Sequence, residues 1–439
     1  MLKVSQYIGN NALAILTKAE HVFTIASLVL YTNAVIPLLI IQGASEGDGV
    51  DITTFNFTPL NLLFVLNYLI VFCLLFLRWQ KVLYFISQNL LFLGFILIVP
   101  LSFAWSAAPD KTLTGSIGMI GTTLFGLYIA SRFTLKEQLK LVAWAFGIVI
   151  VLSLLFIAAL PQYGIMGGVH AGAPRGVFTH KNGLGKFMVL SLMAFLLLVI
   201  SPGSKKLIPW LGIIFSVGLI IASASAGAML NGLMLTIIVL LSSQIFRLRL
   251  PLFISVFLLA TLLALSVTIW FAEIATPVLD LFERDLTLTG RTDIWPAVIQ
   301  KIQERPWLGY GFSGFWHGTR GESADVIRTL RWGVPDSHNG FLDLALQLGL
   351  VGSIVFLLII WIDLVKSVAL VRTRFCPEYL WPIILLSYAF LVNFSESTLL
   401  SQNSFFWILL SSTVMSVSVE FKNLTSQPEE FISQIQGAV

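Results

Sequence analysis

Charged residues are scarce in this chain. Asp, Glu, Lys and Arg make up only 11% of its 439 residues, whereas a soluble globular protein carries roughly 25%. Apolar residues account for 57%, and the mean hydropathy is +0.90. This shortage of charge excludes a water-soluble fold and places the chain in a membrane.

Cysteine is also nearly absent. The two that occur, Cys73 within an apolar run and Cys376 beside charged residues, have no spacing typical of a disulfide framework or a zinc site. The chain lacks a signal-peptide layout, because its first apolar run starts near Val22, is long and has no small-residue cleavage site. We expect that run to remain as the first membrane span, in a fold that is stable without covalent cross-links.

Long apolar runs dominate what is present. Membrane strands would alternate apolar and polar residues, so unbroken runs of about 18 or more residues indicate helices. We predict an all-α integral membrane protein of about 12 transmembrane helices with both termini on one side. The segment at 222–227 could instead be one re-entrant feature. The predicted spans are 22–41, 59–77, 82–104, 112–131, 139–160, 183–200, 207–222, 226–246, 251–271, 341–365, 379–393 and 403–419.

Basic residues in the short connections indicate the orientation, because loops rich in Lys and Arg stay in the cytoplasm. They recur in alternate connections, so we expect those connections and both tails to be cytoplasmic. The first external loop, 42–58, carries acids and no base, which agrees. The predicted organisation is 1–271 with spans 1–9 and a short external segment at 161–182, a large external loop at 272–338, spans 10–12 at 339–419, and a tail at 420–439.

The short external segment gathers positive charge at the start of a helix. Its Gly and Pro residues forbid a regular helix around Arg175, and Asn182 is placed to cap the helix that follows. His180 and Lys181 stand beside that helix end, where free N–H groups and the helix dipole favour anions. Arg175 adds a planar bidentate donor. The pattern favours an anion site, although side chains that touch lipid headgroups would give the same composition.

The large external loop contains a second group of candidates. Residues 294–302 are apolar at helical spacing, which predicts a short amphipathic helix on the membrane with Arg291 in its first turn. A turn follows at Arg305, and the Gly309-Tyr310-Gly311 stretch allows close backbone approach. The middle of the loop, 316–332, shows no recognisable chemistry and could form a lid or an acceptor surface.

A histidine follows at the end of the loop. His338 precedes Asn339 where the apolar run resumes, so it is expected at or just below the membrane surface. It could act as a general base, since an unperturbed imidazole has a pKa of about 6.5. It could equally be an interfacial histidine bonded to the backbone. Four of the five histidines fall outside, but no HExxH or paired-cysteine spacing indicates a metal.

Four ordered motifs resemble a known family. RGVFTHKNGLG from Arg175, GRTDIW from Gly290, RPWLGYG from Arg305 and SHNGFLDLALQLGLVG from Ser337 are similar to the O-antigen ligase and Wzy-type polysaccharide polymerase superfamily. The THKN form is most like its exopolysaccharide-polymerase branch. The resemblance covers about residues 175–352. It implies a GT-C-like bundle in the bacterial inner membrane, with a large periplasmic loop between spans 9 and 10 and a periplasmic active face.

The resemblance also implies an activity. Such proteins are glycosyltransferases that take a glycan from an undecaprenyl-diphosphate carrier and join it to a saccharide, or in the ligases to lipid A core. Catalytic roles for Arg175, Arg291 and His338 are implied, with no metal and no cofactor. The departing diphosphate needs positive charge, so we expect arginines to bind it and His338 to take the acceptor proton, with inversion at the anomeric carbon. Further substrate contacts are expected from Lys181, Asn182, His180, Arg305 and Asn339.

Expected partners are the lipid-linked donor, a saccharide or lipid-linked acceptor, the bilayer, and polysaccharide export or chain-length proteins; nothing indicates nucleic acid. The 12-span layout also fits a secondary transporter, and a non-catalytic partner of an assembly complex would keep the same spans. Spans almost free of charge favour surface chemistry, because transporters place ionisable groups at the midplane. Aromatic residues near the outer surface could line lipid access or form an ordinary aromatic belt: Trp270, Phe271, Trp295, Trp307, Phe312, Phe315 and Trp316.

Overall fold

The computed structural model describes residues 2–44, 55–203, 206–246, 248, 252, 291–331 and 333–426, with side chains from residue 15 onward except those of 243, 291 and 292. Within these ranges the chain is helical, with one isolated β-bridge between Ile165 and Pro174 and no strand. The predicted span 251–271, the loop before Arg291 and the end of the tail lie outside the described residues.

The helices follow one another through short connections, and many have a clear start signal. Proline occupies the first turn of α3, α6 and α16, where its missing N–H costs nothing. Thr134 and Glu137 form a capping box before α7. The elements are α1 (Leu2–Tyr31), α2 (Ile36–Ile40), α3 (Thr58–Phe76), α4 (Trp79–Ser87), α5 (Leu90–Leu101), η2 (Ser102–Trp105), α6 (Pro109–Arg132), α7 (Leu135–Ala159), α8 (Pro161–Gly164), η3 (Gly168–His170), α9 (Lys181–Ile200), α10 (Leu207–Ala222), α11 (Ala226–Ile245), α13 (Arg291–Glu304), α14 (Ser323–Leu330), α15 (Gly340–Thr373), α16 (Pro377–Val392) and α17 (Phe405–Thr425).

Six of the helices in the described ranges are long and apolar enough to cross a membrane: α3, α6, α7, α9, α15 and α17. A seventh crossing results if α4 and the helical stretch after it count as one bent span. The described part of the chain is therefore all-helical, with spans typical of an integral membrane protein, as predicted. The number of about 12 spans and the GT-C-like arrangement are not confirmed, because α10, α16 and the apolar part of α11 are shorter.

The predicted span 82–104 is broken in the middle. α4 and the helical stretch Leu90–Trp105 meet at 95°. Asn89, which starts α5, is buried, and its side-chain N–H group donates to the backbone oxygen of Phe85 at 2.8 Å and to that of Met415 at 3.4 Å. A buried amide needs such partners, so it fixes the bend that the apolar pattern alone did not reveal.

The predicted span 341–365 is also interrupted. Gly349 has φ 63° and ψ −168°, a conformation open to glycine and not to other residues, so α15 consists of two helical pieces. The break leaves backbone N–H groups of α15 without partners inside the helix, and the RPWLGYG motif supplies carbonyl partners for them. The N–H groups of Leu350 and Val351 donate to the oxygens of Pro306 and Trp307, at 2.8 and 3.1 Å. The predicted close approach around Tyr310 is thereby confirmed, since its N–H donates to Leu346 at 2.7 Å.

Small residues let the central helices pack closely. α6 carries Gly118, Gly121 and Gly126, and a Cβ atom at any of them would overlap side chains of neighbouring segments, such as Gln402 at the first and Tyr68 at the second. Helices in lipid associate through such close packing, because lipid tails provide no hydrophobic drive between helices. The bundle is thus built around α6, with α17 and α3 against it.

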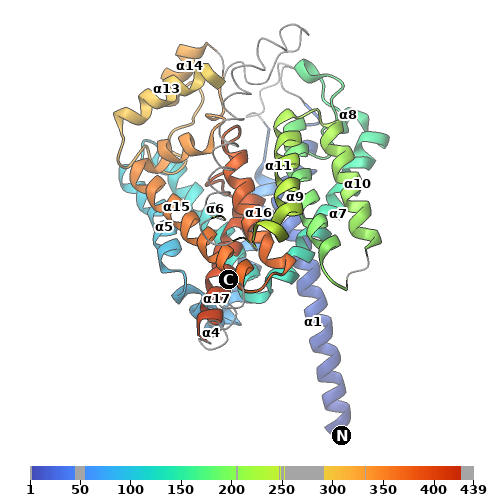
Figure 1. Ribbon diagram of the computed structural model, residues 1–439. Coiled ribbons are helices and arrows are strands. Elements are labelled where there is room, and N and C mark those ends of the chain that lie inside the picture. Colours follow the sequence, from blue (N-terminus) through green and yellow to red (C-terminus); the bar gives the residue numbers. More distant parts are fainter. Residues whose placement is uncertain are drawn as a thin grey trace.

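The two ends of the bundle differ. α13 and α14 lie at one end, where α8 also lies, and the N-terminus of α1 lies at the opposite end (Figure 1). The two segments predicted to be external therefore share one end. The described part of the long loop has its own small core, made by Ile294, Val298, Tyr310, Phe315, Val326, Val334 and Leu346.

Candidate active site

His338 occupies a turn of unusual backbone geometry just before α15. Its φ is 50°, in the left-handed region that non-glycine residues rarely adopt. One carboxylate oxygen of Asp336 accepts a hydrogen bond from the His338 backbone N–H at 2.8 Å and lies 3.3 Å from Nδ1 of the imidazole. A carboxylate beside Nδ1 favours the tautomer that carries its proton there, so that Nε2 can accept a proton. The His338 side chain is 29% exposed and therefore accessible to a ligand.

The flanking residues fix this turn. The Ser337 hydroxyl is buried; it donates to the backbone oxygen of Asn339 at 2.7 Å and accepts from its N–H at 3.2 Å. The side-chain oxygen of Asn339 accepts from the N–H groups of Phe341 and Leu342, at 3.0 and 3.2 Å. Asn339 thus caps α15. The geometry gives it this structural role, and a substrate contact from Asn339 stays a prediction.

A buried carboxylate below the turn connects three parts of the chain. Asp343 is 5% exposed and accepts from the indole N–H of Trp316 at 2.8 Å. The backbone N–H of Ser337 lies 3.3 Å from each of its oxygens, and the Ser397 hydroxyl donates to one of them. Asp343 therefore ties the long loop and the α16–α17 connection to the first turn of α15, beside His338. The sequence did contain a signal for this role, since Asp343 is an acid at the start of an apolar run. Burying a carboxylate is costly unless it is hydrogen-bonded.

α13 packs against the same turn. The indole N–H of Trp295 donates to the backbone oxygen of Ser337 at 3.1 Å. The predicted amphipathic helix is confirmed, with Ile294 and Val298 buried one turn apart. Arg291 precedes Trp295 by one turn, so its backbone lies on the same face of α13. The atoms of the Arg291 side chain lie outside the described part of the chain.

The aromatic residues predicted near the outer surface have different roles. Trp295 donates to the backbone of the His338 turn, and Trp316 donates to the Asp343 carboxylate. Neither a lipid-access path nor an aromatic belt predicts such hydrogen bonds. Phe312 and Phe315 are buried, whereas Trp307 is largely exposed. Residues 270–271 lie outside the described residues.

A lysine joins α13 to α14 on the outer side of the loop. Nζ of Lys301 lies 2.7 Å from Asp325 and 3.0 Å from Glu304. Burial by itself would lower the pKa of Lys301, but hydrogen bonds to these two carboxylates raise it above its usual range. The lysine therefore stays charged and binds α14 to α13, which gives the loop middle a fixed place.

Arg305, a predicted substrate contact, belongs to the same outer layer. Its guanidinium pairs with Glu322 at 3.3 Å and stands 4.7 Å from the centre of the Tyr310 ring. The ring faces of aromatic residues attract such cations. Arg305 thus helps to hold the residue before α14 against the RPWLGYG turn, and a substrate contact from it stays a prediction.

Arg175 is fully buried among backbone oxygens. Its guanidinium donates to the oxygens of Tyr163 at 2.7 Å, Ala44 at 3.0 Å and Thr179 at 3.4 Å, and also to that of Gly43. These partners come from three separate stretches of chain. Arg175 therefore cross-links the external segment in this structure. A direct contact with diphosphate stays a prediction, and it would require the guanidinium to leave these carbonyl groups.

α9 begins at Lys181, and His180 caps it. Nδ1 of His180 accepts from the backbone N–H of Asn182 at 3.1 Å. The prediction that Asn182 is the cap is therefore wrong, because the helix begins one residue before it. The rings of His180 and His170 meet edge to face with centres 5.3 Å apart. Nζ of Lys181 lies 3.4 Å from the backbone oxygen of Ala224, between α10 and α11.

The connection between α16 and α17 links the starts of α9 and α15. Glu396 pairs with Lys186 of α9 at 2.8 Å. The N–H of Gly340, the first residue of α15, lies 3.1 Å from the backbone oxygen of Glu396 and 2.9 Å from that of Asn393. A Cβ atom at Gly340 would overlap the Asn393 side chain. The helices that follow the two predicted external segments, α9 and α15, are thus both bonded to the α16–α17 connection. The sequence pattern did not indicate this role for the connection.

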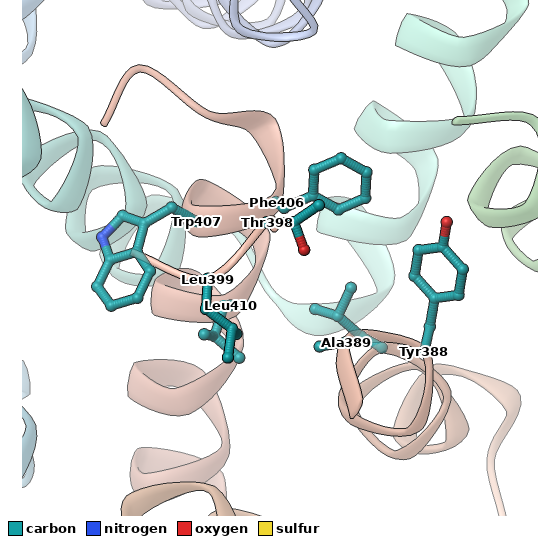
Figure 2. A pocket seen from close by; sticks show the side chains of 8 residues that line it. Tyr388, Ala389, Thr398, Leu399, Phe406, Trp407 and Leu410 are labelled. Atoms are coloured by element: carbon teal, nitrogen blue, oxygen red, sulfur yellow. The ribbon is translucent and has the colours of Figure 1, made fainter. Parts of the chain in front are cut away.

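A small cavity lies where this connection meets α16 and α17. Its lining includes Tyr388 of α16, Thr398 and Leu399 of the connection, and Trp407 of α17 (Figure 2). Its volume is about 10 Å³, room for one water molecule at most. The cavity is therefore not a sugar site.

The described residues contain no group of three or more His, Cys, Asp or Glu side chains that could hold a metal ion. Metal-independent chemistry at this end of the bundle stays a prediction.

Residues 211–357 match the family model described as O-antigen ligase. The chain is 25% identical over 292 residues to the exopolysaccharide production protein ExoQ of Rhizobium meliloti (strain 1021). That alignment covers 64% of this chain and 66% of the relative, just under two thirds of its length. Both findings confirm the resemblance to this family, and the family model covers three of the four motifs, those that begin at Gly290, Arg305 and Ser337. The family match includes the His338 turn, and the Arg175 segment precedes it.

Proposed function

We propose that this chain, a relative of the O-antigen ligases and of an exopolysaccharide production protein, is a membrane glycosyltransferase. It transfers a glycan from an undecaprenyl-diphosphate carrier to a saccharide acceptor and so extends a surface polysaccharide. The observation that carries the proposal is the His338 turn, in which Asp336 lies against Nδ1 and the imidazole stays partly exposed. A histidine whose Nδ1 is held by a carboxylate is suited to act as a general base through Nε2.

The proposed reaction is a direct displacement. Nε2 of His338 takes the proton from an acceptor hydroxyl while that oxygen attacks the anomeric carbon of the donor sugar. The bond from this carbon to the diphosphate oxygen breaks, and its electron pair leaves with undecaprenyl diphosphate. Attack and departure on opposite sides invert the anomeric configuration. Asp336 stabilises the imidazolium that forms, as carboxylates beside catalytic histidines do.

Positive charge must stabilise the departing diphosphate. The proposal assigns this to Arg291 at the start of α13 and Lys181 at the start of α9, because helix starts add backbone N–H donors for anions. In this proposal Arg175 has a structural role. It donates hydrogen bonds to carbonyl groups from separate stretches of chain and so keeps the residues before Lys181 in place. His180, the cap of α9, stabilises the same helix start.

The α16–α17 connection supports a single site for both groups. It is bonded to Lys186, in the second turn of α9, and to Gly340, two residues after His338. The base and the lysine end of α9 are therefore fixed to the same short stretch of chain. In the bacterial inner membrane this end of the bundle would face the periplasm, since the basic connections predict the other end to be cytoplasmic.

An O-antigen ligase is the second candidate, favoured by the description of the family model. It would use the same base and the same cations, with lipid A core as the acceptor. The two functions differ only in the acceptor, so supplying both acceptors in one assay separates them.

The test uses purified protein in detergent with an undecaprenyl-diphosphate oligosaccharide, with and without chelator. We expect longer products and free undecaprenyl diphosphate under both conditions. His338→Gln and Arg291→Gln should reduce turnover at least about 100-fold, whereas His21→Gln, at a histidine of α1 that contacts the Thr17 carbonyl, should not reduce it. Normal turnover by the first two variants would overturn the mechanism. Substrate uptake into proteoliposomes without any covalent product would favour the transporter reading instead.

A further inference from the structure

A groove separate from the proposed active site runs along α7, against the end of α9 and the start of α10. Its volume is about 700 Å³, within the range of roughly 300–1,000 Å³ typical of ligand sites. Along α7 it extends from Lys136 to Leu152, about 24 Å at 1.5 Å per residue. Trp144, Ile148 and Val151 of its wall are exposed on the surface of the bundle. The groove therefore opens toward lipid.

One end of the groove is basic and the rest is apolar. Lys136 and Lys140, one turn apart at the start of α7, both line it and are exposed. The adjacent acid, Glu137, is occupied by the backbone N–H and hydroxyl of Thr134, and the described residues that line the groove include no acid. α10 also begins at this end, and Lys206 before it makes no side-chain cap. Two ammonium groups thus stand beside the start of α10, at the mouth of an apolar channel.

We propose that this groove binds an anionic phospholipid. Its phosphate lies between Lys136, Lys140 and the start of α10, and an acyl chain follows α7 past Gly147. A Cβ atom built at Gly147 has no other atom within 4 Å, so the glycine leaves room in the middle of the channel. A lipid without net charge could pack against the apolar wall but would leave the lysines unpaired. The positive charge of Lys136 and Lys140 therefore selects an anionic headgroup. The lysine end matches the cytoplasmic leaflet predicted from the basic connections.

The proposal is independent of the reaction at the other end of the bundle. The proposal predicts a bound lipid between α7, the end of α9 and the start of α10. Two features of the groove recognise this lipid. The charges of Lys136 and Lys140 select the headgroup, and the space at Gly147 admits the chain. Each feature can be removed separately.

Native mass spectrometry of the detergent-solubilised protein, titrated with palmitoyl-oleoyl phosphatidylglycerol, phosphatidylcholine or undecaprenyl phosphate, tests this. We expect phosphatidylglycerol to bind more tightly than phosphatidylcholine, which has no net charge, and than undecaprenyl phosphate, whose chain is much longer than the groove of about 24 Å. The double variant Lys136→Gln, Lys140→Gln should weaken phosphatidylglycerol binding about 10- to 30-fold, since each basic residue near a headgroup contributes about a fivefold or smaller factor. Gly147→Leu should weaken it by blocking the chain.

Matched controls lie elsewhere on the bundle. Lys18→Gln with Lys422→Gln removes the same charge from exposed positions on α1 and α17. Gly94→Leu adds the same side chain to α5 at a glycine that also has nothing within 4 Å. Both should bind phosphatidylglycerol as the wild type does. Equal losses in controls and groove variants, no loss in the groove variants, or tighter binding of either other lipid would overturn the proposal.

Discussion

Replacing Asp343 should disturb His338 without disrupting the bundle. Asp343 accepts hydrogen bonds from Trp316, Ser337 and Ser397. Asparagine has the same shape and keeps one oxygen, but it loses the charge. A hydrogen bond to a charged group contributes about 1.5–3 kcal/mol and a neutral one about 0.5–1.5. Asp343→Asn should therefore cost roughly 2–3 kcal/mol over these bonds. Asp343→Ala strands at least two buried N–H groups and should cost about 2–6 kcal/mol.

The effect on turnover follows from position. The backbone N–H of Ser337 is one of the groups bonded to Asp343, so weakening that bond lets the next residue, His338, shift. A displacement of about 1 Å can reduce a rate by roughly 100-fold. We expect kcat to fall about 10-fold in Asp343→Asn and about 100-fold in Asp343→Ala, with KM much less affected.

The assay is steady-state transfer by purified protein, read together with thermal unfolding of the same samples. Asp325→Asn is the control, because Asp325 bonds to Lys301 and Arg328 on the outer side of the loop and has no bond to the turn. Its turnover should stay within about twofold of the wild type. Wild-type kcat in Asp343→Ala, with the protein folded, would refute the idea that this carboxylate places the base.

The remaining predictions concern the break, the base, the buried arginine and metal dependence. Gly349→Ala should lower the unfolding temperature strongly, because its backbone conformation is open only to glycine and a Cβ would overlap Trp307; Gly147→Ala, with free space around it, should not. His338→Gln should reduce kcat by about 10²- to 10⁴-fold, which steady-state transfer by the purified variant measures. Arg175→Lys should lower stability by roughly 2–4 kcal/mol through lost hydrogen bonds to carbonyl groups; unchanged stability with lost turnover would instead support a direct diphosphate contact. Chelator should leave the rate unchanged, and restoration of a lost rate by added divalent metal would contradict metal-independent chemistry.

The sequence was sufficient for features that depend on local pattern. Apolar runs located the helices in the described residues, and the spacing within residues 294–302 gave α13. The glycines around Tyr310 correctly predicted close backbone approach, since the stretch meets α15 at Leu346. These features follow from residues near each other in the chain, which is where periodicity and turn composition are informative.

Features that depend on contacts between distant segments were missed. Gly349 lies in an apolar run like any spanning glycine, and only its contact with the RPWLGYG motif shows the break. The partners of Arg175 come from residues 43–44, 163 and 179, and no pattern near Arg175 in the sequence indicated these carbonyl contacts. The α16–α17 connection carries only one acid, Glu396, and its position between α9 and α15 is a property of the bundle.

The most direct test of the central claim is the stoichiometry of transfer. Purified protein is incubated with an undecaprenyl-diphosphate oligosaccharide whose anomeric configuration is known, and the free undecaprenyl diphosphate and the new glycosidic bonds are counted in the same sample. The account predicts one undecaprenyl diphosphate released for each bond formed, with the anomeric configuration inverted, and both products reduced at least about 100-fold in His338→Gln. Bond formation without release of the lipid diphosphate, or retained configuration, would contradict it.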